Sequence, residues 1–522
     1  THLCPLLGLS GRGQRIARQY EDREMAQKYY LGIDEGTTGV AAILFDENWN
    51  MAARGYREIT QFYPRAGWVE HDAEEIWDSL RSAVQQAIML VGAQPEEIRC
   101  LGLDHEGESV VVWDTATGRP VYPVIVWQDR RTSAVADALK QTHGAFIRER
   151  TGLTPDAYFS ATKLQWVLDR VDPIRERSKS GQLMAGTMDA WFVWKMTGGR
   201  VHCTDASTAS RTMLYNLHTQ DWDDEILALL RIERKLLPEI RNSASHFGMT
   251  DADEFLGMRC EITGVMADQQ AALLGQACTV PGSIKTTYGT GCFMLMHTGD
   301  RPVLSEHGIL TTVAWRTNGK DEYALDGGSY VAGAATQWLR DGLKIISSAA
   351  ETEEMARRAG DNGGIYFVPA FAGLAAPDWD SYARGTLIGV TGGTTRDHIV
   401  RAALESTAYQ VKDILDAMAK EAKMPIASMR CDGGATCNAF LMQFQADILG
   451  LPLEVPEISE TTALGAAYMA ALGAKELSSS DEIAGHWRLH RYYEPHMSAD
   501  ERNTLFSQWH RAVERSLGWE KE

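Results

Sequence analysis

Short apolar runs alternate with longer stretches of helical periodicity along this chain. The runs have the length of buried strands and end in polar or glycine-rich residues. They cover residues 29–34, 40–46, 98–103, 110–113, 124–127, 282–287 and 292–296. In residues 73–89, apolar side chains recur at helical spacing, which predicts an amphipathic helix. Further helices are predicted at 333–343, 398–418 and 461–472, and the small residues of the last favour tight packing.

A turn rich in glycine and threonine joins two strands at two separate places. Residues 35–39 form the first turn and residues 288–291 the second. Backbone N–H groups and hydroxyls in such a turn could surround phosphate oxygens, and Asp34 before the first turn could hold a magnesium ion through water. An ordinary hairpin has the same pattern. The repetition indicates a duplicated fold, in which two facing turns would hold one polyphosphate.

Asp268 lies close to mid-chain, between an apolar run and a small-residue helix start, within the segment 264–272. A carboxylate at a strand end is most often an N-cap that accepts backbone N–H bonds. If the chain has two domains, however, this position is a hinge, and ligands bind between domains. The pattern alone leaves both interpretations open.

Three other segments carry candidate chemistry. Residues 104–109 place an aspartate, a histidine and two glutamates at a strand end, but neighbours on a strand alternate faces, so at most two converge on a metal. We therefore favour a polar pocket wall in which Glu108 accepts hydrogen bonds from hydroxyls. Tyr158 starts a helix, and a ligand role stays open for it. The Gly433-Gly434 turn would let the backbone approach a flat ligand.

Length and charge narrow the class of protein. A chain of 522 residues is long enough for two or three domains. The net charge of -19 argues against nucleic acid as a partner, and no apolar run is long enough to span a membrane. Eight scattered cysteines without a CxxC pair indicate reduced thiols in a cytoplasmic protein. Residues 1–24 lack a secretory signal and are expected to be an extension outside the fold.

Many segments in sequence order resemble the FGGY carbohydrate kinases, most closely those acting on glycerol. The resemblance runs from Lys28 to about Ala474. The matching segments are Asp34-Glu35-Gly36-Thr37-Thr38, residues 64–72, Ile125-Val126-Trp127-Gln128, residues 158–166, residues 267–273, residues 288–296, Gln337-Trp338-Leu339-Arg340, residues 385–405 and Asp432-Gly433-Gly434-Ala435. Any one of these could be chance, but the ordered series could not.

The resemblance implies a fold and a reaction. The fold would be α/β, with two actin-like (ribonuclease H-like) ATPase domains, residues 25–275 and 276–522, around a central cleft. The reaction would be magnesium-dependent transfer of the ATP γ-phosphoryl group to a terminal hydroxyl of a polyol or sugar. ATP and Mg²⁺ are therefore the expected cofactors, and a homodimer is an expected assembly.

The resemblance also assigns roles by position. Asp268 would be the catalytic base, and Asp34 the metal-site acid. The implied substrate contacts are Gly107, Glu108, Trp127, Tyr158, Asp268, Gln269 and Phe293. The implied nucleotide contacts are Thr37, Thr38, Gly39, Thr290, Gly333, Gln337, Gly434 and Asn438.

One departure concerns the substrate. Family members that act on glycerol have an arginine where this chain has Gly107, so a donor to substrate hydroxyls is missing and room is expected beside the glycine. Glycerol or a related polyol is the first prediction. A larger polyol or ketose, such as erythritol or a pentulose, is the alternative. A non-catalytic actin-like binder is a third, which the presence of both Asp34 and Asp268 argues against.

Overall fold

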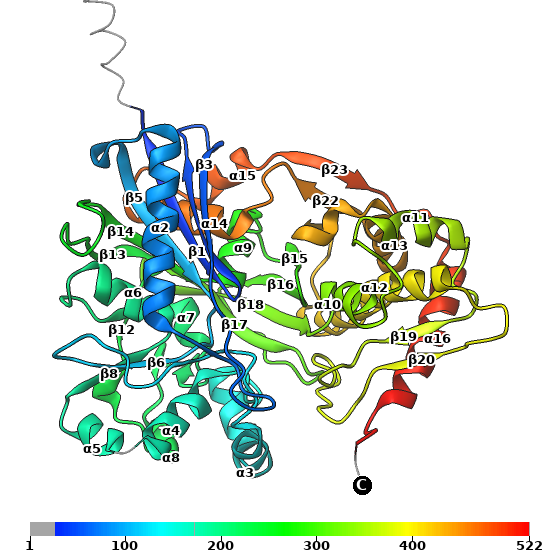
Figure 1. Cartoon of the computed structure of the whole chain (residues 1–522), viewed down its shortest axis with the longest axis horizontal. Coiled ribbons are helices and arrows are strands. Elements are labelled where there is room, and N and C mark those ends of the chain that lie inside the picture. The colour runs from blue at the N-terminus through cyan, green and yellow to red at the C-terminus, as the bar shows by residue number, and fades with distance from the viewer. Residues whose placement is uncertain (1–26, 172, 521–522) are drawn as a thin grey trace, which may run out of the picture.

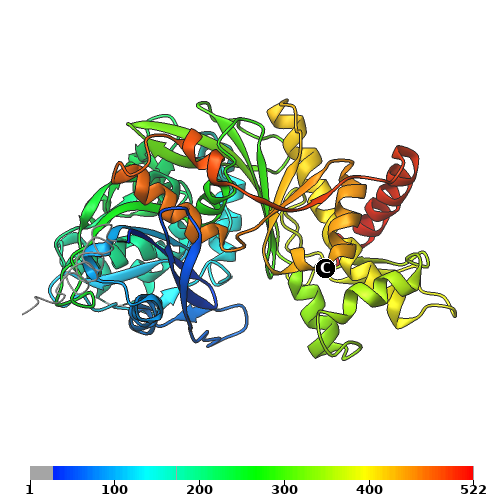
Figure 2. The same ribbon diagram turned by 90° about the horizontal axis from the view of Figure 1, so that it is seen from above.

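The structure is a computed structural model that describes residues 27–171 and 173–520, so the predicted extension 1–24 lies outside the described residues. Two large sheets form two lobes that lie side by side in both views of the chain (Figure 1 and Figure 2). The first lobe is built on a six-stranded sheet of order β13-β14-β5-β1-β2-β3, and the second on a seven-stranded sheet of order β17-β18-β16-β15-β21-β22-β23. This arrangement agrees with the predicted fold class.

The predicted strands and helices are present with small shifts at their ends. The strands of the first sheet are β13 (Ala244–Met249), β14 (Glu261–Ala267), β5 (Ile98–His105), β1 (Tyr29–Gly36), β2 (Gly39–Phe45) and β3 (Met51–Glu58). Those of the second are β17 (Leu310–Thr317), β18 (Lys320–Ser329), β16 (Cys292–Gly299), β15 (Ile284–Tyr288), β21 (Met429–Asp432), β22 (Leu453–Pro456) and β23 (Leu489–Tyr493). The helices used below are α2 (Ala73–Val91), α3 (Ser133–Thr151), α4 (Ser160–Arg170), α6 (Met188–Met196), α7 (Ala206–Ser210), α9 (Asp268–Gly275), α10 (Gly333–Gln337), α11 (Glu351–Ala359), α12 (Arg396–Ala422), α13 (Ala439–Leu449) and α14 (Thr461–Gly473).

The two sheets repeat one arrangement at their centres. In the first lobe β1 pairs antiparallel with β2 and parallel with β5, so that Asp34 lies opposite Asp104. In the second lobe β15 pairs antiparallel with β16 and parallel with β21, so that Thr287 lies opposite Asp432. Each lobe therefore presents a hairpin turn and the carboxyl end of a parallel strand at corresponding places.

Helix α14, from the second half of the chain, packs on the first sheet (Figure 1). The contact is close enough to require glycine on the strands. A Cβ at Gly32 would lie 2.2 Å from the Ala463 carbonyl oxygen, and one at Gly102 would lie 2.0 Å from that of Ala466. Because α14 reads Thr-Thr-Ala-Leu-Gly-Ala-Ala, its backbone can come this near. The tight packing expected of this helix is confirmed, and it ties the two halves of the sequence together.

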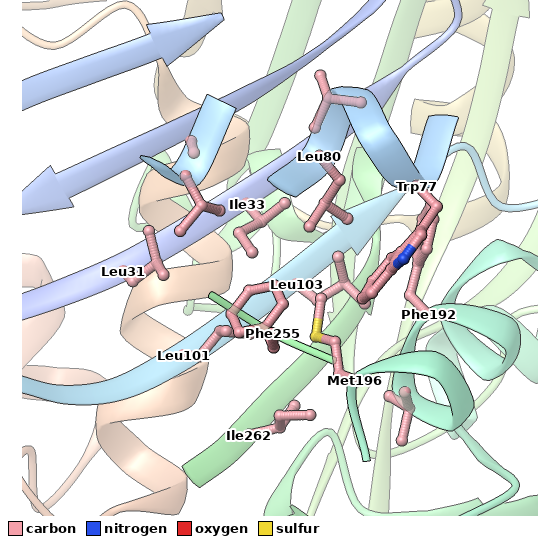
Figure 3. Close-up of a cluster of buried hydrophobic side chains, with 14 of the residues drawn as sticks. Leu31, Ile33, Trp77, Leu80, Leu101, Leu103, Phe192, Met196, Phe255 and Ile262 are labelled. Carbon is pink, nitrogen blue, oxygen red and sulfur yellow. The ribbon is translucent and has the colours of Figure 1, made fainter. Parts of the chain in front are cut away.

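The core of the first lobe lies between β1, β5 and the helices that cover them. Figure 3 shows leucine and isoleucine side chains of β1 and β5 packed against aromatic side chains from α2 and α6. The residues labelled there are Leu31, Ile33, Trp77, Leu80, Leu101, Leu103, Phe192, Met196, Phe255 and Ile262. The amphipathic pattern of 73–89 thus marks the face that α2 buries.

Two expectations need correction. The helix predicted at 333–343 is regular only over α10 and continues as a π-helical turn at Trp338–Gly342. The apolar and Gly/Ala-rich surroundings of Cys437 predict a buried core thiol, but Cys437 is exposed at the end of the short 3₁₀ helix Gly434–Cys437. The remaining described cysteines are buried and free. Among the described helices, none is long and apolar enough to cross a membrane.

Candidate active site

Asp268 is the first residue of α9, directly after β14. The N-cap of α9 is Ala267, so the side chain of Asp268 does not cap the helix. Its Oδ1 accepts a hydrogen bond from the Gln269 amide at 2.7 Å, and its Oδ2 accepts one from Gln269 Nε2 at 2.9 Å. The N-cap interpretation is therefore wrong, and among the described residues Gln269 alone hydrogen-bonds to the half-buried carboxylate.

A buried lysine from the other lobe holds Gln269 in turn. Lys285, on β15, donates through Nζ to Gln269 Oε1 and, at 3.1 Å, to Thr287 Oγ1. Burial lowers the pKa of this lysine. Because Gln269 Oε1 faces the lysine, its amide nitrogen must face Asp268. The chain of contacts from Lys285 to Gln269 to Asp268 fixes the orientation of the carboxylate across the junction of the two lobes.

Several carboxyl groups lie at the ends of β1 and β5 beside Asp268. Burial, together with the charge of Asp268, raises the pKa of Asp34 to about 7. The pKa of Asp104 is raised by burial and by the charge of Asp34. Within the described part of the chain, neither side-chain oxygen of Asp104 or Glu35 makes a hydrogen bond of good geometry. Buried, unpartnered carboxylate oxygens are what a hard cation such as Mg²⁺ binds, so the residues present fit that ion.

The described residues offer fewer ligands than a complete Mg²⁺ site requires. Within the described part of the chain, no group of three or more His, Cys, Asp or Glu side chains is arranged to hold a metal ion by itself. Mg²⁺ commonly keeps several waters and takes its other ligands from substrate phosphates. Asp34 is thus placed for a site that a bound polyphosphate would complete.

The first glycine- and threonine-rich turn is tied to the substrate wall. The Thr37 hydroxyl donates to Glu106 Oε2 at 2.9 Å and accepts from Trp127 Nε1 at 2.9 Å. Thr38 is exposed at the tip of the turn. Gly39 is buried beneath Tyr56, whose hydroxyl would lie 2.5 Å from a Cβ at that position. Of these predicted nucleotide contacts, Thr38 is the exposed one, whereas Thr37 is partly buried and its carbonyl accepts from Gln61 Nε2 at 3.4 Å.

Three predicted substrate residues form an aromatic wall from both lobes. The ring of Trp127 meets that of Tyr158 edge-on at 5.7 Å between centroids, and that of Phe293 at 6.1 Å. Tyr158 precedes α4 in the first lobe, whereas Phe293 lies on β16 in the second. The wall is therefore assembled only when the lobes meet, and it offers an apolar surface for a short carbon chain.

A cavity of about 550 Å³ in the second lobe holds the remaining nucleotide candidates. Its walls come from the β15–β16 turn, α10, α11, α12 and the turn before α13. Thr290, Gly333, Gln337, Gly434 and Asn438 all line it. Gly333 must lack a side chain, because a Cβ there would lie 2.6 Å from the Gly289 carbonyl oxygen. A cavity of this volume is large enough for a nucleotide base and sugar.

The space beside Gly107 is not open, contrary to the sequence-based expectation. A Cβ at Gly107 would lie 3.1 Å from Cγ of Arg211 and 3.2 Å from Cβ of Ala267. Arg211 follows α7, and its Nε donates to Glu108 Oε1 at 2.7 Å. Glu108 therefore accepts its hydrogen bond from a guanidinium rather than only from ligand hydroxyls. The stem of another arginine fills the room that the missing side chain leaves.

Sequence reasoning missed Arg211 and Lys285. Each had a signal: Lys285 stands inside a predicted buried strand, and Arg211 stands in a run of small and apolar residues. A charged residue in such a place is seldom buried unless it is paired. What the pattern could not supply was the partners: Glu108 lies 103 positions from Arg211, and Gln269 lies 16 positions from Lys285 but in the other lobe.

The duplicated sheets, the cavity beside one hairpin turn and the oriented carboxylate between the lobes define a two-lobed, actin-like phosphotransferase. The chain belongs to the FGGY family of carbohydrate kinases. The model of the family's N-terminal domain matches residues 29–275, and that of its C-terminal domain matches residues 284–474. The family recognised from the sequence, and the kinase activity that it implies, are confirmed.

Individual relatives agree over nearly the full length. The chain is 55% identical to glycerol kinase 2 of Thermotoga maritima over 495 residues, covering 95% of this chain and 100% of the relative. It is 50% identical to the glycerol kinase of Desulforamulus reducens over 499 residues, again covering 95% and 100%. Among solved structures, Plasmodium falciparum glycerol kinase with ADP superposes with a TM-score of 0.87 at 33% identity, covering 94% of this chain and 98% of that one.

Proposed function

We propose that this kinase transfers the γ-phosphoryl group of ATP to a terminal hydroxyl of glycerol. The observation that carries the proposal is the carboxylate of Asp268, which is oriented from both lobes and lies beside an aromatic wall and the buried carboxyl groups at the ends of β1 and β5. Identities of 50 to 55% with glycerol kinases favour glycerol over other polyols. Phosphoryl transfer needs positioning and charge neutralisation more than covalent chemistry, which suits such a site.

Asp268 acts as general base in this proposal. Its carboxylate takes the proton of the attacking hydroxyl while that oxygen approaches the γ-phosphorus. Gln269 occupies one side of both carboxylate oxygens, which leaves their outer lone pairs for the substrate. Lys285 keeps Gln269 from turning over. Trp127, Tyr158 and Phe293 pack on the carbon skeleton and keep water away from the reacting hydroxyl.

On the nucleotide side, we propose that the cavity lined by Gly333, Gln337, Gly434 and Asn438 takes the base and ribose. Thr290 at its edge, and Thr38 with the Thr37 backbone in the other lobe, contact the phosphates. Gly39 acts indirectly, by letting the turn pack on Tyr56. Asp34 would hold Mg²⁺, and Asp104 and Glu35, two carboxyl groups whose pKa values burial raises, lie beside it. The ion would neutralise charge on the transferring phosphoryl group.

We further propose a division into residues 25–275 and 276–522, with α14 as the segment of the second that packs on the first. The scattered free cysteines favour a reducing compartment such as the cytoplasm. Assembly as a homodimer stays a prediction.

A polyol panel tests the substrate. Release of ADP from ATP is measured with glycerol, erythritol, a pentulose and no acceptor, each with Mg²⁺. We expect the highest kcat/KM with glycerol. A preference for erythritol or the ketose would replace glycerol as substrate but keep the kinase. No stimulation by any acceptor, with ATP still bound, would contradict the catalytic roles assigned above.

A further inference from the structure

Arg211 is a buried guanidinium that the proposed chemistry leaves without a task. Its side chain is 4% exposed, and it lies between two acids of different lobes. Nε donates to Glu108 Oε1 at 2.7 Å in the first lobe, and Nη1 lies 2.9 Å from Asp326 Oδ2 on β18 in the second. Its Cζ is 5.8 Å from the centre of the Tyr158 ring. Arg211 is thus in contact with Glu108 and adjacent to Tyr158, two of the proposed substrate residues.

Not all of the N–H groups of Arg211 are hydrogen-bonded within the described part of the protein. A guanidinium has five N–H groups. Among the described residues, only Nε makes a hydrogen bond of good geometry to another side chain, and Nη1 is buried without one despite its ion pair. No described residue accepts a hydrogen bond from Nη2. Buried donors without acceptors are unfavourable, so an acceptor supplied by a ligand would stabilise this arrangement.

Only one of the two carboxylate oxygens of Glu108 accepts a hydrogen bond from a described residue. Arg211 occupies Oε1, whereas no described residue donates to Oε2. A free carboxylate oxygen thus stands beside free guanidinium N–H groups. A hydroxyl group both donates and accepts, so two adjacent hydroxyls can each give a proton to the carboxylate or receive one from the guanidinium. The pair is complementary to a vicinal diol.

We propose that Arg211 binds the substrate, and that Arg211 and Glu108 together hydrogen-bond to the two hydroxyls of glycerol that are not phosphorylated. This inference rests on the proposed function and adds the element that selects the substrate. Gly107 fits this arrangement, because a Cβ there would lie 3.1 Å from Cγ of Arg211, tighter than an ordinary contact, and would press on the arginine side chain. The guanidinium expected at position 107 is supplied instead from the residue after α7. The pocket therefore suits a small triol, not a longer polyol.

Two variants and two analogues test the assignment. Arg211→Gln removes the positive charge and keeps a hydrogen-bond donor. Arg211→Lys keeps the positive charge but places it on a single ammonium group. The analogues are 1,2-propanediol and 1,3-propanediol, each of which lacks one of the two hydroxyls that do not react. Values of kcat/KM are measured with glycerol and with both diols, by competition against glycerol where turnover is slow. The KM for ATP and the Tm are measured alongside.

We expect Arg211→Gln to lower kcat/KM for glycerol about 10- to 100-fold, the range for one hydrogen bond to a charged group. For the diol that lacks the contacted hydroxyl, the loss should be several-fold smaller, because the wild type has no such bond to lose. Arg211→Lys should recover part of the glycerol activity. The KM for ATP should change little in either variant.

Arg316→Gln is the matched control. Arg316 is also a buried arginine near the junction of the lobes, with its Nε 2.6 Å from Asp321 Oδ1, but it contacts none of the proposed substrate residues. It should lower the Tm and leave the ratio of glycerol to diol activity unchanged.

Equal losses with glycerol and both diols in Arg211→Gln would overturn the inference and reduce Arg211 to a structural role. A glycerol activity unchanged by both Arg211 variants would overturn it as well. These outcomes differ from failure of the proposed function, in which the wild-type enzyme itself would not phosphorylate glycerol.

Discussion

Replacing Asp268 with asparagine removes one negative charge from the junction of the lobes and changes few atoms. An asparagine carbonyl can still accept from the Gln269 amide, which lies 2.7 Å from Oδ1 in the wild type. Its NH₂ group would then face Gln269 Nε2, also a donor, across the present 2.9 Å contact. Gln269 cannot relieve this by turning over without losing the hydrogen bond that Lys285 donates to its Oε1. One hydrogen bond is lost, which costs about 1–3 kcal/mol when the group is buried.

Relief of charge repulsion opposes that cost. The charge of Asp268 raises the pKa values of Asp34, Glu106 and Glu108, so its removal makes each easier to ionise. The two effects have opposite signs, and we expect the Tm of Asp268→Asn to stay within a few degrees of the wild type. Loss of the general base, by contrast, is uncompensated and should lower kcat about 10²- to 10⁴-fold.

The assay measures ADP release with saturating glycerol and ATP, and calorimetry measures ADP binding to the same preparation. ADP should bind as in the wild type, because no nucleotide candidate contacts Asp268. A kcat above about a tenth of the wild-type value would remove Asp268 from the role of base. A collapse of the Tm or of ADP binding would instead show that the carboxylate holds the fold.

Four further variants test other parts of the structure. Gly107→Arg should lower kcat/KM for glycerol, since the new side chain displaces Arg211; an increase in steady-state assays would mean that the site has room. Gly102→Val should lower the free energy of unfolding in urea by roughly 3 kcal/mol or more, because its Cβ would lie 2.0 Å from an α14 carbonyl oxygen. Gly144→Ala in α3 is the control: its Cβ would lie 3.9 Å from its nearest neighbour, and it should stabilise the protein slightly. Burial lowers the pKa of Lys163 to about 7, so the unfolded chain binds more protons between about pH 7 and 10.5, and stability should rise with pH there. Lys163→Met should flatten that rise in urea midpoints, and an unchanged pH profile would contradict the shift.

Local pattern determined much of this protein. The apolar runs, the two glycine- and threonine-rich turns and the 73–89 periodicity predicted β1, β2, β15, β16 and α2, because strand and helix periods depend only on neighbours along the chain. The ordered segments also identified the family and, by position, the candidate residues. Five of those candidates, from Thr290 to Asn438, indeed line one cavity.

Only the tertiary structure decided what surrounds the candidates. Whether Gly107 leaves a gap depends on Arg211, more than 100 positions away in sequence, which fills the space from another element. Whether Asp268 caps a helix or faces the junction depends on Gln269 and on Lys285 from the opposite lobe. Partners of buried charges are chosen by how the sheets meet, and a single sequence carries no record of which distant groups come into contact.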